Sequence, residues 1–181
     1  MHSPPAIVPE DPDPRPLRYA DLVDAWAVPV LRWCARLGGP RIDPEDAAQD
    51  VFERVLRRLP TLRDPATLPA WLFQLTRRVV IDHRRRAWLR RWVGGTVPDV
   101  SDPRGVDDAD TARVVHAVLD VLPRDLREVL VLCDLEERTA DEAAELVSVP
   151  VGTIRSRLRR ARERFEVEAR RRDLVPDRGP R

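Results

Sequence analysis

Among the side chains that could make functional contacts, arginine is the most prominent in this sequence, and it is concentrated in two stretches. All 32 basic side chains are Arg, and the net charge of the whole chain is only +1. Nine arginines stand against three glutamates in residues 155–172, and seven stand against one aspartate in residues 77–91. Because the planar guanidinium makes forked hydrogen bonds to phosphate and guanine, both stretches are candidates for contact with nucleic acid. For residues 155–172 the alternative is an ordinary hydrated helix face.

The C-terminal arginines follow a pattern that is typical of a helix-turn-helix. Residues 139–142 read Thr-Ala-Asp-Glu, a capping-box signature that predicts the start of a short helix. That helix is predicted to end at residues 148–150 (Ser-Val-Pro), where a longer helix follows. Its outer face carries three arginines at spacings of four and three: Arg155, Arg159 and Arg162. In a helix-turn-helix, the second helix lies in the major groove of DNA and reads base edges.

A stripe of acidic side chains marks another predicted helix. All five charged residues between Asp43 and Glu53 are acidic. Those that share one helical face are Asp46, Asp50 and Glu53, with Gln49 beside them. Because carboxylates on one face repel each other, the stripe favours a basic partner. A metal site is disfavoured because a stripe on one helix has no enclosing loop, and a hydrated face remains the alternative.

The helix predicted for residues 69–92 interleaves arginine with tryptophan. The residues concerned are Arg77, Arg78, Arg84, Arg85, Arg86, Trp88 and Trp92. Aromatic rings stack on unpaired bases and guanidinium groups hold the backbone, so this combination suits single-stranded or opening DNA. The alternative is that the two Trp side chains pack into the core of the domain.

The hydrophobic pattern predicts that helices form the whole fold. Apolar residues recur at spacings of three and four, and no alternating run predicts a strand. The predicted helices span residues 17–37, 43–59, 69–92, 111–122, 124–135, 140–147 and 151–172. Residues 94–110 contain two adjacent Gly, two Pro and five Asp, a composition that cannot build a core and indicates a linker.

We therefore expect an all-α protein of two small helical domains joined by a flexible linker, the C-terminal one a helix-turn-helix. The predicted parts are a tail (1–16), a first domain (17–92), a linker (93–111), a second domain (112–172) and a second tail (173–181). With so little apolar surface between them, the two domains are expected to behave as independent units.

Few other residues offer chemistry. Cys34 and Cys133 lie nearly a hundred residues apart, without CxxC spacing, and are typical of small core residues in a reduced chain. The three histidines are scattered, so we predict no metal and no cofactor, and no recognisable acid/base pair, nucleophile or Gly-rich phosphate loop indicates an enzyme. The first 16 residues are unlike a signal peptide, and no apolar run approaches the ~20 residues of a membrane span. A cytoplasmic protein without membrane insertion is expected.

The run from Leu122 to Phe165 resembles the fourth domain of extracytoplasmic-function sigma factors of bacterial RNA polymerase. The most specific match is residues 150–158, Pro-Val-Gly-Thr-Ile-Arg-Ser-Arg-Leu. The resemblance implies that this helix-turn-helix reads the minus-thirty-five element of a promoter. By the family pattern, the base readers are Arg155, Ser156 and Arg159, and the residues near phosphates are Thr153, Arg157 and Arg160. Ser148 stands where the family usually has Gly, and Ala143 where it usually has Ile.

The N-terminal half resembles the second domain of the same family. Residues 43–46 (Asp-Pro-Glu-Asp) with 49–52 (Gln-Asp-Val-Phe) match the segment that grips core polymerase, which implies contacts from Asp46, Gln49, Asp50, Phe52 and Glu53. Residues 70–72, 76–77 and 81–85 match the segment that opens and reads the minus-ten element. The residues this implies are Arg77, Arg78, Asp82, Arg84, Arg85 and Trp88. Arg78 stands where the family commonly has Asn.

The two resemblances together predict a sigma factor that binds core RNA polymerase and directs transcription initiation. The implied partners are core polymerase, double-stranded promoter DNA, the unpaired minus-ten strand and an anti-sigma factor. A stand-alone helix-turn-helix regulator is the alternative, but it leaves the acidic stripe and the Arg/Trp helix without a purpose.

Overall fold

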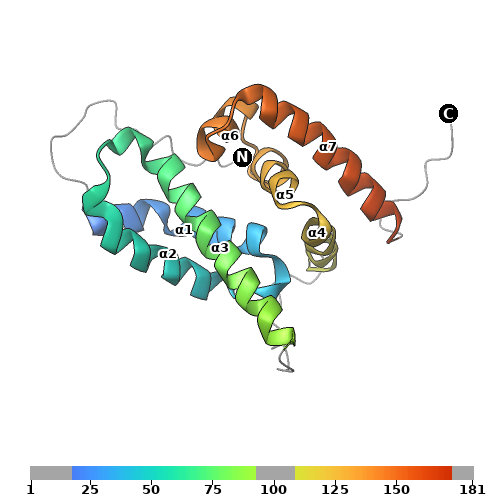
Figure 1. The fold of residues 1–181 in the computed structure, drawn as a ribbon, viewed down its shortest axis with the longest axis horizontal. Coiled ribbons are helices and arrows are strands. Elements are labelled where there is room, and N and C mark those ends of the chain that lie inside the picture. Colours follow the sequence, from blue (N-terminus) through green and yellow to red (C-terminus); the bar gives the residue numbers. More distant parts are fainter. Residues whose placement is uncertain (1–17, 93–108, 173–181) are drawn as a thin grey trace.

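Seven helices account for most of the computed structural model, which describes residues 18–92 and 109–172. Figure 1 shows them in chain order: α1 (Tyr19–Gly38), α2 (Pro44–Arg58), α3 (Leu68–Trp92), α4 (Ala109–Val121), α5 (Arg124–Leu130), α6 (Ala140–Val147) and α7 (Val151–Arg170). Short 3-10 turns, η1 (Gly39–Arg41), η2 (Leu59–Thr61) and η3 (Pro65–Thr67), join the first three, and a π-helical segment, η4 (Val131–Leu135), continues α5. The all-α prediction is confirmed.

Helices α1, α2 and α3 form the N-terminal domain. The side chain of Asp43 accepts hydrogen bonds from the backbone N–H groups of Glu45 and Asp46, at 2.8 and 3.3 Å, and so starts α2 as its sequence predicted. Trp33 of α1 is fully buried and packs edge-on against Phe73 of α3, with ring centroids 5.1 Å apart.

Helices α4 to α7 form the C-terminal domain. The predicted capping box is present: the Thr139 hydroxyl accepts from the Glu142 N–H, and the Glu142 carboxylate accepts from the Thr139 N–H at 2.8 Å. Helix α6 ends at Ser148, whose φ of 60° and ψ of 49° are left-handed. Buried Ile154 and Ala161 anchor the inner face of α7.

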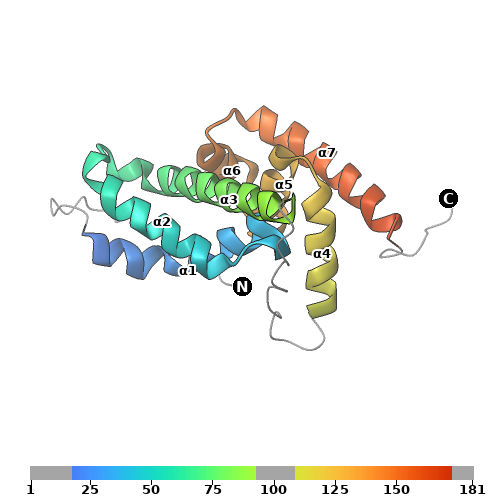
Figure 2. The same ribbon diagram turned by 60° about the horizontal axis from the view of Figure 1, so that its bottom comes forward.

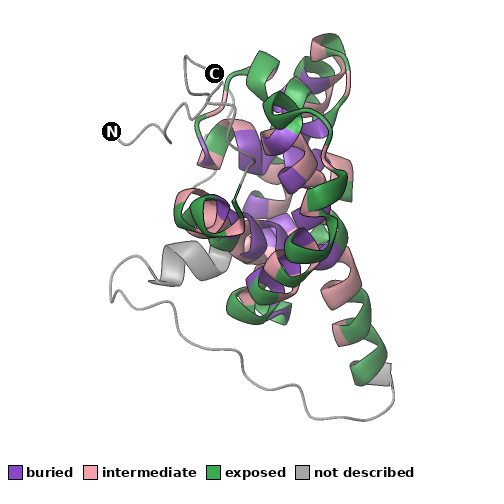
Figure 3. Ribbon diagram, turned by 90° about the vertical axis from the view of Figure 1, so that its left-hand side faces the viewer, coloured by how far each residue is buried: buried purple, intermediate pink, exposed green. Residues whose placement is uncertain are grey.

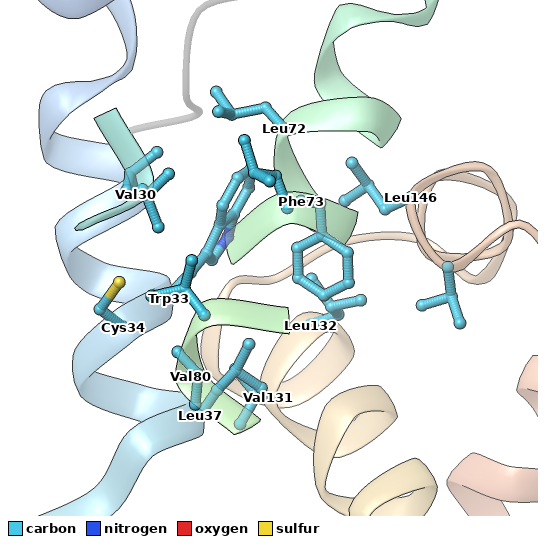
Figure 4. Packing of buried hydrophobic residues seen from close by; sticks show 14 of the residues in the cluster. Val30, Trp33, Cys34, Leu37, Leu72, Phe73, Val80, Val131, Leu132 and Leu146 are labelled. Atoms are coloured by element: carbon cyan, nitrogen blue, oxygen red, sulfur yellow. The ribbon is translucent and has the colours of Figure 1, made fainter. Parts of the chain in front are cut away.

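The two domains pack against each other through one continuous apolar core, so the expectation that they behave as independent units is wrong for this structure. Figure 4 shows Phe73 of α3 lying between the N-terminal core and Leu132 and Leu146 of the C-terminal domain. The Gln74 side chain donates 3.0 Å hydrogen bonds to the carbonyls of Leu146 and Val147 at the end of α6. Figures 2 and 3 show α4 to α7 lying along one side of α1 and α3, with buried residues concentrated between them.

The predicted linker and tails lie largely outside the described residues. The residues outside the described set include both predicted tails, 1–16 and 173–181, and residues 93–108 of the linker. Helix α4 begins at Ala109, so residues 109–111, predicted as the end of the linker, are helical.

Candidate nucleic-acid and polymerase interfaces

The outer face of α7 is open to solvent over the predicted base readers. Arg155, Ser156 and Arg159 are exposed, with 70% of the Arg159 side chain accessible, and so is Arg160, which was predicted near a phosphate. Within residues 18–92 and 109–172, the Arg159 guanidinium pairs with Glu163, one turn along the helix, at 2.7 Å. Exposed pairs of this spacing are worth only about 0.3–0.5 kcal/mol, so a base edge can replace Glu163 at small cost.

Two other arginines of α7 brace the helix against its own domain. Arg157 has only 24% of its side chain exposed, and its Nε lies 3.5 Å from the Asp125 carboxylate on α5. Arg162 makes a forked contact with Asp134 of η4, at 3.0 and 2.6 Å, and this carboxylate raises the pKa of Arg162. Arg162 is thus paired with η4 although 60% of its side chain is exposed, whereas its spacing had placed it on the groove-facing side with Arg155 and Arg159. Thr153 is half-buried at the helix start.

The acidic stripe on α2 is only partly a free surface. Asp46, Gln49 and Glu53 are exposed. Asp50 instead turns toward α3, where His83 Nε2 lies 2.8 Å from its carboxylate. The hydrogen bond from His83 lowers the pKa of Asp50. This contact, in which 34% of the Asp50 side chain stays exposed, links α2 to α3.

Apolar surface adjoins the exposed acidic residues of α2. Leu56 is 57% exposed one turn beyond Glu53, whereas Phe52 is half-buried and accepts a 3.4 Å hydrogen bond from the Tyr19 hydroxyl at its carbonyl. Leu56 was not among the predicted contact residues. Its position three residues after Glu53, on the same helical face, was the sequence signal for it.

The predicted minus-ten residues of α3 divide into three groups. Arg78, Arg85 and Trp88 are exposed, with half of Trp88 accessible, so Trp88 is not the core residue that the alternative required. Asp82 pairs with Arg54 of α2 at 3.0 Å. Arg77 and Arg84 instead point into the contact between the domains. The side chain of Trp92 lies outside the described set.

Three buried carboxylates of the C-terminal domain receive arginines of the N-terminal domain. Glu128, whose side chain is 3% exposed, accepts from Arg77 at 2.6 Å. Asp120, 6% exposed, accepts from Arg84 at 2.6 Å and lies 2.9 Å from Arg41. The third carboxylate pairs two arginines of α1, Arg32 and Arg36, with Glu136. None of these carboxylates was singled out from the sequence.

Other chemistry receives little support in the described parts of the chain. Residues 18–92 and 109–172 contain no group of three His, Cys, Asp or Glu side chains placed to hold a metal ion. Cys34 is buried, and burial raises the pKa of its thiol to about 12, so it is unreactive. Among the helices described, none has the length and apolar content to cross a bilayer.

Comparison with known proteins agrees with this geometry. Residues 22–93 match the family model of sigma-70 region 2, and residues 112–165 match that of sigma-70 region 4. The SigE sigma factor of Mycolicibacterium smegmatis is 32% identical over 157 residues, covering 81% of this chain and 60% of the relative. EcfG of Rhodopseudomonas palustris is 33% identical over 145 residues, covering 77% of this chain and 78% of the relative.

A solved structure shares the arrangement of both domains. The sigma factor RpoE of Bartonella quintana, determined in complex with the anti-sigma factor NepR, superposes with a TM-score of 0.62 at 23% identity. The match covers 81% of this chain and 94% of that one. With two matched regions in the family's order and relatives above 30% identity, the chain belongs to the extracytoplasmic-function family of RNA polymerase sigma factors.

Proposed function

We propose that this sigma factor meets its partners through three separate surfaces. The exposed side chains of α2, including Asp46, Gln49 and Glu53, bind core RNA polymerase, and Asp50 supports them from beside His83. The face of α3 with Arg78, Arg85 and Trp88 receives the minus-ten element. The outer face of α7 reads the minus-thirty-five element.

The observation that carries this proposal is the open face of α7. Four polar side chains, Arg155, Ser156, Arg159 and Arg160, stand on one exposed surface of a helix whose opposite side is anchored in the core. An α-helix fits the major groove, where guanine presents two acceptors to a forked guanidinium. Thr153 and Arg157 flank this face, so we assign them to phosphate contacts at its edge.

On α3 the exposed Trp88 offers a stacking platform, and the neighbouring guanidinium groups offer charge for an unpaired strand. Arg77 and Arg84 join this surface only when their present partners release them. Asp82 is a positioning residue, because it holds Arg54 beneath the same helix. The protein itself performs no catalysis in this scheme: RNA synthesis belongs to the polymerase, in the bacterial cytoplasm.

A protein partner that restrains the sigma factor is part of the proposal. The Bartonella quintana relative is held by an anti-sigma factor, and we extend a partner of that kind to this chain.

Gel filtration with purified core polymerase, in the absence of DNA, tests the proposal. The expected result is co-elution, and Glu53→Arg is expected to reduce it. In-vitro transcription with the reconstituted holoenzyme on a genomic library would then map start sites that share two upstream elements. A protein that binds duplex DNA but does not co-elute with core would be a stand-alone regulator.

A further inference from the structure

Two of the arginines assigned to the minus-ten element are already occupied by the protein's own carboxylates. Arg77 donates from Nε to Glu128 at 2.6 Å, and Arg84 donates to Asp120 at 2.6 Å and to the Gly38 carbonyl at 2.8 Å. Carboxylate and phosphate oxygens are competing acceptors for a guanidinium group. These two arginines therefore cannot hold a DNA strand while the domains are packed together.

The contact between the two domains contains strong ion pairs and one buried carboxylate oxygen that lacks a hydrogen bond. Glu128 and Asp120 are almost fully buried, so their attraction to arginine is weakly screened. The second carboxylate oxygen of Glu128 is nevertheless buried and has no hydrogen-bond partner among the residues that the structure describes. An unsatisfied buried acceptor opposes the closed arrangement, because water would satisfy it once the domains separate. The ion pairs therefore add to the shared apolar core in holding the domains together, while the unpaired oxygen weakens the closed arrangement.

The remaining recognition surfaces are not blocked in this way. Arg155 and Arg159 stay exposed on α7, and Arg78 and Arg85 stay exposed on α3. Closure thus removes two arginines from single-strand binding while it leaves the duplex-reading helix accessible. The closed arrangement therefore affects binding of the minus-ten element and not of the minus-thirty-five element.

From these contacts we infer that Asp120 and Glu128 form an autoinhibitory latch, which keeps Arg84 and Arg77 from unpaired DNA until the two domains separate. The inference rests on the proposed role of α3 in binding the minus-ten strand. If only a small fraction of the free protein is open, its apparent affinity for a single strand falls by that fraction. Removing the latch should therefore tighten single-strand binding by about tenfold.

The test uses the full chain and a fluorescent single-stranded DNA 20-mer of random sequence, titrated by anisotropy without polymerase. The variant D120N/E128Q keeps the shape of both side chains and removes their charges. We expect it to bind about tenfold more tightly than the native chain, and small-angle scattering should show a larger radius of gyration. The matched control is E137Q/E145Q, which removes two exposed carboxylates from the same domain. Its affinity should change less than about twofold, because it alters only the general charge. An equal gain in both double variants would refute the latch.

A second variant opens the contact without changing any charge. Gln74→Ala removes the two hydrogen bonds to the end of α6 and leaves Asp120, Glu128 and their arginines intact. Because the ion pairs remain, Gln74→Ala should expand the protein and tighten single-strand binding less than D120N/E128Q does. If that double variant fails to fold by circular dichroism, the single variants D120N and E128Q, each of which removes one charge of the latch, decide the question. Unchanged single-strand affinity and radius of gyration in both single variants would then overturn the inference.

Co-elution with core polymerase, measured on the same samples, separates this inference from the proposed function. Tighter single-strand binding without co-elution would leave the latch standing and remove the assignment of α2. Co-elution, together with unchanged single-strand affinity and radius of gyration in the latch variants, would support the assignment of α2 and refute the latch.

Discussion

Arg159→Ala should relax sequence preference in the upstream promoter element at one base pair. Arg159 lies one turn beyond Arg155 on the open face of α7, and 70% of its side chain is accessible. A lost forked contact to a base typically removes about 1–3 kcal/mol of discrimination. Binding must first release the exposed pair with Glu163, which offsets about 0.3–0.5 kcal/mol. The net loss of about 0.5–2.7 kcal/mol corresponds to roughly 2- to 100-fold at the base pair that Arg159 contacts.

The assay is titration of the reconstituted holoenzyme against a set of single-base promoter variants at two salt concentrations. Arg157→Ala is the comparison, because Arg157 packs beside Asp125 and is mostly covered. That change should weaken binding to every sequence about equally and, if Arg157 reaches a phosphate, lower the salt slope by roughly 1. Glu163→Gln should free Arg159 and strengthen binding by at most about twofold. An even loss of affinity across the whole set for Arg159→Ala would show that this residue reads no base, and the helix would need to be rotated in the groove.

Three further predictions test the polymerase surface and the helix-turn-helix. Glu53→Arg should weaken co-elution with core polymerase more than Asp50→Asn does, since Glu53 is open whereas Asp50 faces His83; equal effects would contradict that division. Ser148→Gly should raise the free energy of unfolding in urea by about 0.5 kcal/mol, because relief of the left-handed backbone exceeds the extra entropy of Gly in the unfolded chain; a loss of stability would oppose this. The N–H of Thr139 lowers the pKa of Glu142, so this carboxylate stabilises the fold above its unfolded pKa, and the gain disappears as pH falls through the lower folded pKa. Glu142→Gln should therefore lower stability at neutral pH and flatten its decline in acid, which pH-dependent urea unfolding would measure; a parallel decline in both proteins would argue against the capping role.

The local features of this protein follow from the sequence alone. The capping box at Thr139 and the Asp43 cap each depend on residues two or three positions apart, so their partners were visible in the linear order. The helices follow from apolar residues at spacings of three and four, and the left-handed position at Ser148 coincides with the departure from Gly noted in the resemblance. Short-range hydrogen bonding and periodicity need no tertiary information, which is why the all-α fold and the two helical domains were predictable.

The tertiary structure decided which charged side chains are free. Arg77 and Glu128 lie 51 residues apart in sequence, and in a chain with 32 arginines and 31 acidic residues no spacing rule selects that pair. The same holds for Asp50, which belongs to the acidic stripe by periodicity and to His83 by packing. Periodicity assigns a residue to a face of its helix, but only the packing of helices against each other determines whether that face meets solvent or another part of the chain. For this reason the sequence identified the arginine-rich helices, and only the structure separated the exposed arginines of α7 from those that the domain contact holds.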